Sequence, residues 1–344
     1  MSEVKIKLAA GTNVGLIRQN NEDNFVVSSD LSTSEWLIPQ VDEYVDLGEF
    51  GALLTVADGM GGANAGEVAS AKAIETIQEF FVPEKLEKVN PDDDSIQEYM
   101  KTVVKQADLN ILNCSKDDPN KEGMGTTIVM AWILGDKVYV CWCGDSRCYV
   151  LNKHNGLIRL SKDHSFVQEL VDKGELEPQY ANDHPLSNIV TRCLGDVENR
   201  SNPETRVYPL HNGDTIMLCS DGLCGLCQDD EIMSRMAEYR KNPTACKNEL
   251  ISLALNNGGY DNVTVALCNV QKEGEEEEEE KEDNIASTVR TTMVGRRFRR
   301  FVKVFFFLLL LLLAIAACIY YFKWYEKIGF LNNIFEYVNQ LFLK

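Results

Sequence analysis

Apolar residues in the first 270 positions occur in short runs separated by glycine, asparagine and aspartate. Runs rich in β-branched and aromatic residues predict buried strands at residues 52–57, 127–134, 137–142, 149–152, 215–219 and 263–270. Apolar spacings of three and four predict helices at residues 65–81, 95–114, 166–173, 231–239 and 244–256. Gly135-Asp136 and Asn155-Gly156 each separate two β-rich runs, as in β-hairpins. Because strands adjoin strands and helices come in pairs, we expect an α+β fold of mainly antiparallel sheets with helices packed outside.

The chain after residue 270 has a different pattern. Residues 271–303 begin with an acidic run and end with four arginines, which predicts a solvated linker. Residues 304–322 are apolar and uncharged, as in a single transmembrane helix; the alternative is a buried core helix, which the acidic linker disfavours. Residues 323–344 have the spacing of a short amphipathic tail. The arginines before the span predict a single-pass protein of the cell membrane whose N-terminal domain, residues 1–270, is cytoplasmic.

The net charge bears on the class of function, and the cysteine content bears on the redox compartment. The formal net charge is −19, which disfavours a nucleic-acid binder because such proteins neutralise phosphates with Lys and Arg. Eleven cysteines, an odd number partly in apolar runs, are typical of buried thiols in a reducing compartment rather than of a disulfide framework. Cys224 and Cys227 have the spacing of a redox or zinc pair, but no second pair accompanies them, so we favour plain thiols.

Several carboxylates lie beside glycines at the ends of the predicted strands. Asp58 ends the run LTVADGMGG, Asp221 ends IMLCSDGLCG, Asp145 follows VCWCG, Asp261 precedes a strand in NNGGYDNVTV, and Glu22 and Asp23 precede FVV. A single aspartate at such a place is commonly a turn residue. Several of them, if gathered at one sheet edge, would repel one another and favour a bound Mg²⁺ or Mn²⁺ ion. The four histidines are scattered in the sequence, which disfavours zinc.

Six strings in order carry a family resemblance: RQNNEDNF, VADGMGG, GMGTT, CGDSR, CSDGL and GGYDNVTV. Together they resemble the metal-dependent type 2C serine/threonine protein phosphatases, and the GMGG form resembles the bacterial branch. The resemblance covers about the first 270 residues and leaves the linker and the apolar span outside. It implies two packed, mainly antiparallel β-sheets flanked by helices, an α-β-β-α sandwich, here followed by the linker and the transmembrane helix.

The resemblance also implies roles for individual residues, with two Mn²⁺ or Mg²⁺ ions as cofactors. Asp58 would bridge both ions, with the Gly59 carbonyl and Glu22 completing one ion and Asp221 and Asp261 holding the other. Asp23 would support these ligands by hydrogen bonding. Arg18 matches the family's phosphate-binding arginine, although a surface salt bridge with Glu22 or Asp23 is the alternative. Asp145 matches a ligand of a weaker third metal site.

Three features depart from the family or vary within it. Met60 replaces the histidine that animal members carry after the second motif, a proposed general acid. Gly225 stands where some members have an acidic residue, so a third ion would have fewer ligands here. Residues 162–192 match the mobile flap that shapes substrate access in bacterial members.

The expected function is hydrolysis of phosphoserine and phosphothreonine in proteins by attack of a metal-bridging hydroxide on phosphorus. A cognate serine/threonine kinase is the expected counterpart. Cysteine-dependent phosphatase chemistry is disfavoured, because no cysteine lies five residues before an arginine in a phosphate loop. The alternative function is a catalytically weak phosphoprotein-binding sensor or adaptor on the same fold. The presence of Asp58, Asp221 and Asp261 argues against this alternative.

Overall fold

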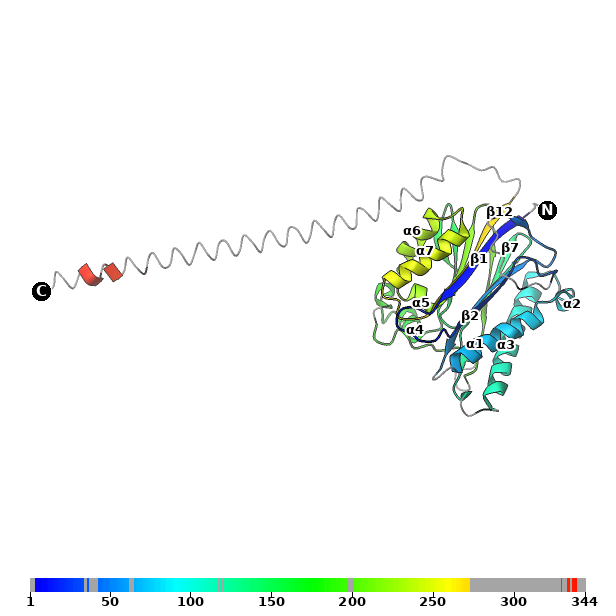
Figure 1. Cartoon of the computed structure of the whole chain (residues 1–344), viewed down its shortest axis with the longest axis horizontal. Coiled ribbons are helices and arrows are strands. Elements are labelled where there is room, and N and C mark those ends of the chain that lie inside the picture. Colours follow the sequence, from blue (N-terminus) through cyan, green and yellow to red (C-terminus); the bar gives the residue numbers. More distant parts are fainter. Residues whose placement is uncertain are drawn as a thin grey trace. The chain divides into compact units, whose positions relative to one another are not determined.

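The structure is a computed structural model with two compact units, residues 1–286 and residues 287–344. Figure 1 shows the whole chain. The structure describes residues 4–33, 36, 43–61, 65–116, 118, 121–182, 184–196, 201–272, 329, 333–334 and 336–338.

Two antiparallel sheets form the centre of the first unit. The first sheet has the strand order β3 (Val45–Asp46), β1 (Val4–Asn13), β12 (Val263–Lys272), β11 (Thr215–Cys219), β8 (Arg147–Asn152) and β9 (Gly156–Arg159). The second has the order β10 (Glu204–Pro209), β7 (Lys137–Cys143), β6 (Ile128–Leu134), β4 (Ala52–Met60) and β2 (Asp23–Ser28), and β5 (Gly125–Thr126) pairs with the end of β4. All of these pairings are antiparallel, which confirms the predicted sheet type.

Helices cover the outer faces of both sheets. Among the described residues of the first unit, the helical segments are α1 (Ala65–Phe80), α2 (Pro83–Leu86), α3 (Asp93–Lys116), α4 (Phe166–Asp172), the 3-10 turn η2 (Pro178–Tyr180), α5 (Asp221–Cys224), α6 (Asp229–Glu238) and α7 (Pro243–Asn256). In Figure 1, α1 and α3 lie on one side of the strands and α6 and α7 on the other. Helix α1 packs on β4, and α7 packs on β1 and β12. The predicted arrangement of helices outside two sheets is confirmed.

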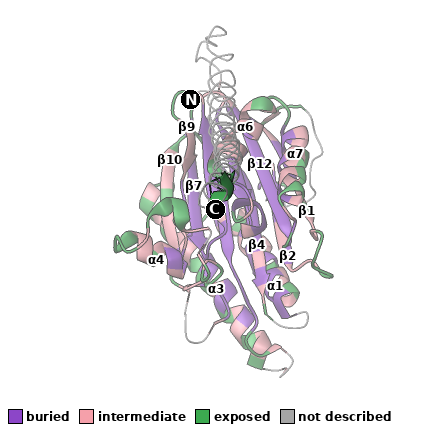
Figure 2. Cartoon of the chain, turned by 90° about the vertical axis from the view of Figure 1, so that its left-hand side faces the viewer, coloured by how far each residue is buried: buried purple, intermediate pink, exposed green. Residues whose placement is uncertain are grey.

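Three apolar clusters account for this layering. One lies between the two sheets and includes Val56, Val140 and Leu218, all fully buried. A second joins α1 and α3 to the outer face of the second sheet, and a third joins α6 and α7 to the first sheet. Figure 2 shows the buried strands β4, β7 and β12 in purple between these helices. Burial on both faces explains why their sequences are continuous apolar runs.

The predicted membrane span, residues 304–322, lies outside the described residues, as does most of the linker, residues 273–303. Within the part of the chain that the structure describes, every helix is too short or too polar to cross a membrane. Of the predicted amphipathic tail, residues 329, 333–334 and 336–338 are described, and they are helical and exposed.

Candidate metal centre

Asp58 and Asp23 lie opposite each other on neighbouring strands of the second sheet. Asp58 is near the end of β4, and it is the register partner of Asp23, the first residue of β2. Gly59 follows Asp58 and donates its backbone N–H to the Glu22 carbonyl at 3.2 Å. A Cβ atom at Gly59 would lie 2.3 Å from the carbonyl oxygen of Gly66, so only glycine permits this close approach of β4 to α1.

Asp221 and Asp261 come from neighbouring strands of the first sheet. Asp221 follows the end of β11, and Asp261 lies just before β12, which pairs with β11. The two aspartates therefore lie at the same edge of that sheet. A Cβ atom at Gly222 would lie 1.9 Å from the Asn262 carbonyl oxygen, so the glycine after Asp221 is required by the contact between these two segments.

The carboxylates from both sheets form one acidic cluster. Desolvation holds the pKa of Asp58 well above its usual value, and the charges of Asp23, Asp221 and Asp145 add to the shift. Burial and then the charge of Asp261 raise the pKa of Asp221, and the charge of Asp221 in turn raises the pKa of Asp58. Burial and the charge of Asp221 raise the pKa of Asp145 to about 8. Protons or cations must relieve this repulsion.

The carboxylates of this cluster do not all point to one common centre. Within the residues that the structure describes, no three Asp, Glu, His or Cys side chains are arranged around one point as ready ligands of an ion. Glu22 nevertheless lies close to the first turn of α1, because its carboxyl carbon is 3.0 Å from the position of a Cβ atom on Gly66. Burial raises the pKa of Glu22. The donors gathered here are oxygen atoms, the ligands that Mg²⁺ and Mn²⁺ prefer.

Asp23 ties the two sheets together beneath this cluster. Its Oδ2 atom accepts hydrogen bonds from Ser220 Oγ at 2.7 Å and from Thr264 Oγ1 at 2.6 Å, two residues of the first sheet and its edge. Burial raises the pKa of Asp23 to about 7, and the two hydroxyl hydrogen bonds partly offset that shift. Ser220 directly precedes Asp221, so the hydrogen bond from Ser220 to Asp23 also restrains the position of Asp221.

Arg18 supplies a positive charge at the outer side of the cluster. Its Nη2 atom lies 2.7 Å from Asp261 Oδ2, and half of its side chain is exposed. The hydrogen bond to Asp261 is the main cause that raises the pKa of Arg18, and the charges of Glu22 and Asp221 act in the same direction. The direct partner is therefore Asp261, rather than Glu22 or Asp23 as the salt-bridge alternative suggested.

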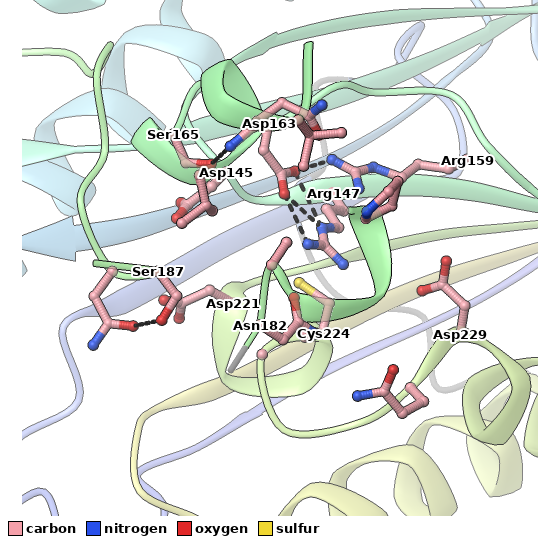
Figure 3. A pocket seen from close by; sticks show the side chains of 18 of the residues that line it. Asp145, Arg147, Arg159, Asp163, Ser165, Asn182, Ser187, Asp221, Cys224 and Asp229 are labelled. Carbon is pink, nitrogen blue, oxygen red and sulfur yellow. Dashed lines mark hydrogen bonds and ion pairs between the residues drawn. The ribbon is translucent and has the colours of Figure 1, made fainter. Parts of the chain in front are cut away.

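Asp145 faces a cavity of about 290 Å³ between the cluster and the predicted flap. Asp221 lines it too, with Arg147, Asp163 and residues of the flap such as Ser187. Figure 3 shows the Asp163 carboxylate paired with the guanidinium groups of both Arg147 and Arg159. Arg147 Nη2 and Nε lie 2.7 and 3.1 Å from Asp163 oxygens. This ion pair connects the strand after Asp145 to the start of the flap.

The flap segment, residues 162–192, contains α4 and η2 and is closed at its base. The Phe166 N–H donates to the Ile189 carbonyl at 2.9 Å, and the Thr191 N–H donates to the His164 carbonyl at 2.8 Å. His164 Nδ1 in turn accepts from the Gly144 N–H at 3.1 Å, directly before Asp145. The base of the flap and the Asp145 loop are thus joined by backbone and side-chain hydrogen bonds.

The residues that support the acidic side chains were not predicted from the sequence. The missed residues are Ser220, Thr264, Asn262, Arg147, Asp163 and His164. Asn262 is typical of them: its Oδ1 atom accepts the Glu22 N–H at 2.7 Å. Their only signal in the sequence is their position within three residues of a candidate aspartate or inside the flap. Cys224 and Cys227 are buried and free, as expected for plain thiols.

The chain is similar in sequence and in fold to proteins of one family. The profile of Protein phosphatase 2C matches residues 40–256. The serine/threonine phosphatase stp of Listeria monocytogenes is 33% identical over 256 residues, which are 74% of this chain and 92% of that protein. The crystal structure of the Mycobacterium tuberculosis serine/threonine phosphatase PstP/Ppp has a TM-score of 0.63 and 30% identity, with 78% of this chain and 99% of that one covered. A structure of the PstP catalytic domain in complex with two manganese ions has a TM-score of 0.62 and 30% identity, with the same shares covered.

A two-sheet sandwich with a carboxylate cluster at one edge defines a metal-dependent phosphoprotein phosphatase. The chain belongs to the protein phosphatase 2C family. It is an enzyme, and its cofactors are Mn²⁺ or Mg²⁺ ions, on which the family depends.

Proposed function

We propose that this enzyme hydrolyses phosphoserine and phosphothreonine residues of proteins at the acidic cluster around Asp58. The observation that carries the proposal is the meeting of Asp58, Asp221 and Asp261 with Arg18, although they come from distant parts of the chain. The relatives named as serine/threonine phosphatases support the same substrate class.

The acidic residues fit two divalent ions by their chemistry. Asp58 would be the ligand shared by both ions, the Gly59 carbonyl and Glu22 would help to hold one of them, and Asp221 and Asp261 would hold the other. Asp145 would hold a weaker third ion. The raised pKa values of Asp58 and Asp221 support this assignment, because burial and the neighbouring carboxylates disfavour their charged forms and a bound cation would offset both effects. When bound, the ions supply an activated water and offset charge on the phosphoryl oxygens.

The chain itself contributes positioning and charge. The Arg18 guanidinium is half exposed and can bind two phosphate oxygens with its planar fork, which orients the phosphorus atom toward Asp58. Asp23, held by Ser220 and Thr264, fixes the strand end that carries Asp58. Met60 has no proton to donate, so the leaving alkoxide must be protonated by a group other than the residue at that position.

Replacing Asp58 tests the proposal. Asp58→Asn in the full chain removes one negative charge with little change in shape, so we expect a folded protein that does not hydrolyse a phosphothreonine peptide. Asp46→Asn, at an exposed position on the short strand β3, is the matched control and keeps full turnover. Unchanged turnover by the Asp58 variant refutes the assignment. Wild-type protein that binds phosphopeptide without hydrolysing it favours the sensor or adaptor alternative.

We also propose that residues 304–322 anchor the enzyme in the cell membrane, with the N-terminal domain in the cytoplasm. The uncharged apolar sequence and the four arginines before it support this. Leu313→Arg places a charge at the centre of the span and should release the protein from membranes during alkaline extraction, whereas Leu313→Ala should not. Release of wild-type protein under the same conditions contradicts the anchor. A serine/threonine kinase of the same cell is the partner we expect.

A further inference from the structure

Three large apolar side chains lie exposed beside the ion pair of Arg18 and Asp261. Leu16, Ile17 and Tyr260 are 64%, 66% and 61% exposed, the highest values for large apolar residues among the described residues 4–272. Ile17 adjoins Arg18 in the chain, and Tyr260 adjoins Asp261. Single exposed apolar residues are ordinary, but a group of them beside a functional site is typical of an interaction surface.

Two glycines bring the Leu16 and Tyr260 side chains to one turn, and Ile17 adjoins Leu16 in the chain. The Leu16 N–H donates to the Gly259 carbonyl at 2.7 Å, which joins the two loops. A Cβ atom on Gly259 would lie 2.9 Å from Leu16 Cγ, and one on Gly258 would lie 2.6 Å from the Tyr260 ring. The Leu16 and Tyr260 side chains therefore lie over the glycine turn itself. Both glycines have positive φ values, +127° and +54°, that other residues rarely adopt.

We propose that Leu16, Ile17 and Tyr260 form an apolar docking surface for an apolar side chain next to the phosphorylated residue of a protein substrate. The inference rests on the proposed function, because it takes Arg18 as the phosphate-binding group. Consecutive Cα atoms are about 3.8 Å apart, so a peptide whose phosphate contacts Arg18 has its neighbouring residues within reach of Ile17 and Tyr260. Contact with an apolar side chain removes apolar area of both partners from water.

Other occupants suit this surface less well. An anionic lipid surface is repelled by the acidic groups beside it, Glu22, Asp221 and Asp261. A second copy of the chain needs an interface of about 800 Å² on each partner, far more than three side chains provide. A flanking residue of a bound phosphopeptide needs no such area, because the phosphate contact already holds the peptide in place.

The test uses pairs of phosphothreonine peptides that differ at a single position, directly before or directly after the phosphothreonine. One peptide of each pair carries leucine at that position and the other carries serine. For the wild-type full chain with Mn²⁺, we expect kcat/KM to favour leucine at one position by about fivefold, less than the ~10–200-fold per methylene that a closed apolar pocket gives. Ile17→Ser and Tyr260→Ser, on separate loops, should each lower this ratio toward one. Ile17→Leu should retain it, and so should Leu109→Ser, which alters an exposed leucine on α3 outside the surface.

Three outcomes decide the matter. Loss of the leucine preference in both loop variants, with the preference kept in Leu109→Ser, supports the docking surface. Hydrolysis of all wild-type peptides at equal rates, or a preference that both loop variants retain, overturns the docking surface and leaves the proposed function intact. Failure of the wild-type enzyme to hydrolyse any peptide overturns the proposed function and the docking surface with it.

Discussion

Replacing Thr264 by valine tests whether hydroxyl donors hold the buried carboxylate of Asp23 in place. Thr264 is fully buried on β12, and its Oγ1 atom lies 2.6 Å from Asp23 Oδ2. Ser220 is the second hydroxyl donor, at 2.7 Å. Valine has nearly the shape of threonine and is equally suited to a strand, so the substitution removes the hydroxyl with little change in backbone preference.

The magnitude depends on the charge of Asp23. A hydrogen bond to a charged group contributes about 1.5–3 kcal/mol, and we expect Thr264→Val to lower the free energy of unfolding by that amount where Asp23 is ionised. The folded pKa of Asp23 is raised from 3.8 to about 7, so the folded chain binds this proton more tightly than the unfolded chain. The resulting stabilisation is fully present below about pH 4 and is lost as the pH rises toward 7.

Loss of a donor raises the folded pKa of Asp23 further, because the Thr264 hydrogen bond lowers it. The variant therefore continues to lose stability above pH 7, where the wild type no longer does. We expect the difference between them to be small at pH 5, where Asp23 is protonated in both folded proteins, and to be largest at pH 8.

Urea unfolding at pH 5 and pH 8 measures this difference, with EDTA present so that metal ions do not contribute. Thr264→Ser is the control, because it keeps the hydroxyl and loses only a methyl group. The reasoning is refuted if valine destabilises no more than serine at pH 8, or if the effect of valine is the same at both pH values.

Three further predictions concern the metal ions, the close approach at Gly59 and the apolar core. EDTA abolishes hydrolysis of a phosphothreonine peptide and added Mn²⁺ restores it; hydrolysis that persists in EDTA contradicts the metal dependence. Gly59→Ala lowers Tm, because its Cβ atom would lie 2.3 Å from the Gly66 carbonyl oxygen, and an unchanged melting curve contradicts this. Phe81→Ala lowers the free energy of unfolding by about 3–5 kcal/mol, because Phe81 is fully buried with its ring 5.1 Å from that of Trp132; urea unfolding checks it, and a loss below about 1 kcal/mol is inconsistent with that packing.

Elements with a strong local signal could be predicted from the sequence, and elements defined by distant contacts could not. The β6–β7 hairpin was predicted because Gly135, with φ +59°, separates two apolar runs. Strand β1 was missed, although Val4 and Ile6 alternate with lysines, since its partner β12 lies at the other end of the domain. Strand β10 was missed because it is an edge strand without a buried residue, and its pattern is therefore weak.

The same distinction applies to the site. Asp58, Asp221 and Asp261 were found because each lies beside glycine at a strand end, a pattern visible within a few residues. The hydroxyl groups that hold Asp23 could not be found in this way, because Ser220 and Thr264 lie 197 and 241 residues further along the chain. Only the packing of the two sheets brings these hydroxyl groups to Asp23. How one sheet is placed against the other cannot be read from the sequence.

The charge balance at the sheet edge explains why the site needs cations to receive a phosphate. The first sheet and its loops bring Asp221, Asp261 and Asp145 to this edge, and the second brings Asp58, with Glu22 and Asp23 beside it. Desolvation between the sheets strengthens their mutual repulsion, which the raised pKa values of Asp58, Asp145 and Asp221 record. Arg18 and Arg147 are too few to balance so many carboxylates. A phosphate dianion would be repelled by the chain by itself, so substrate binding requires bound divalent ions, which also relieve the repulsion among the carboxylates.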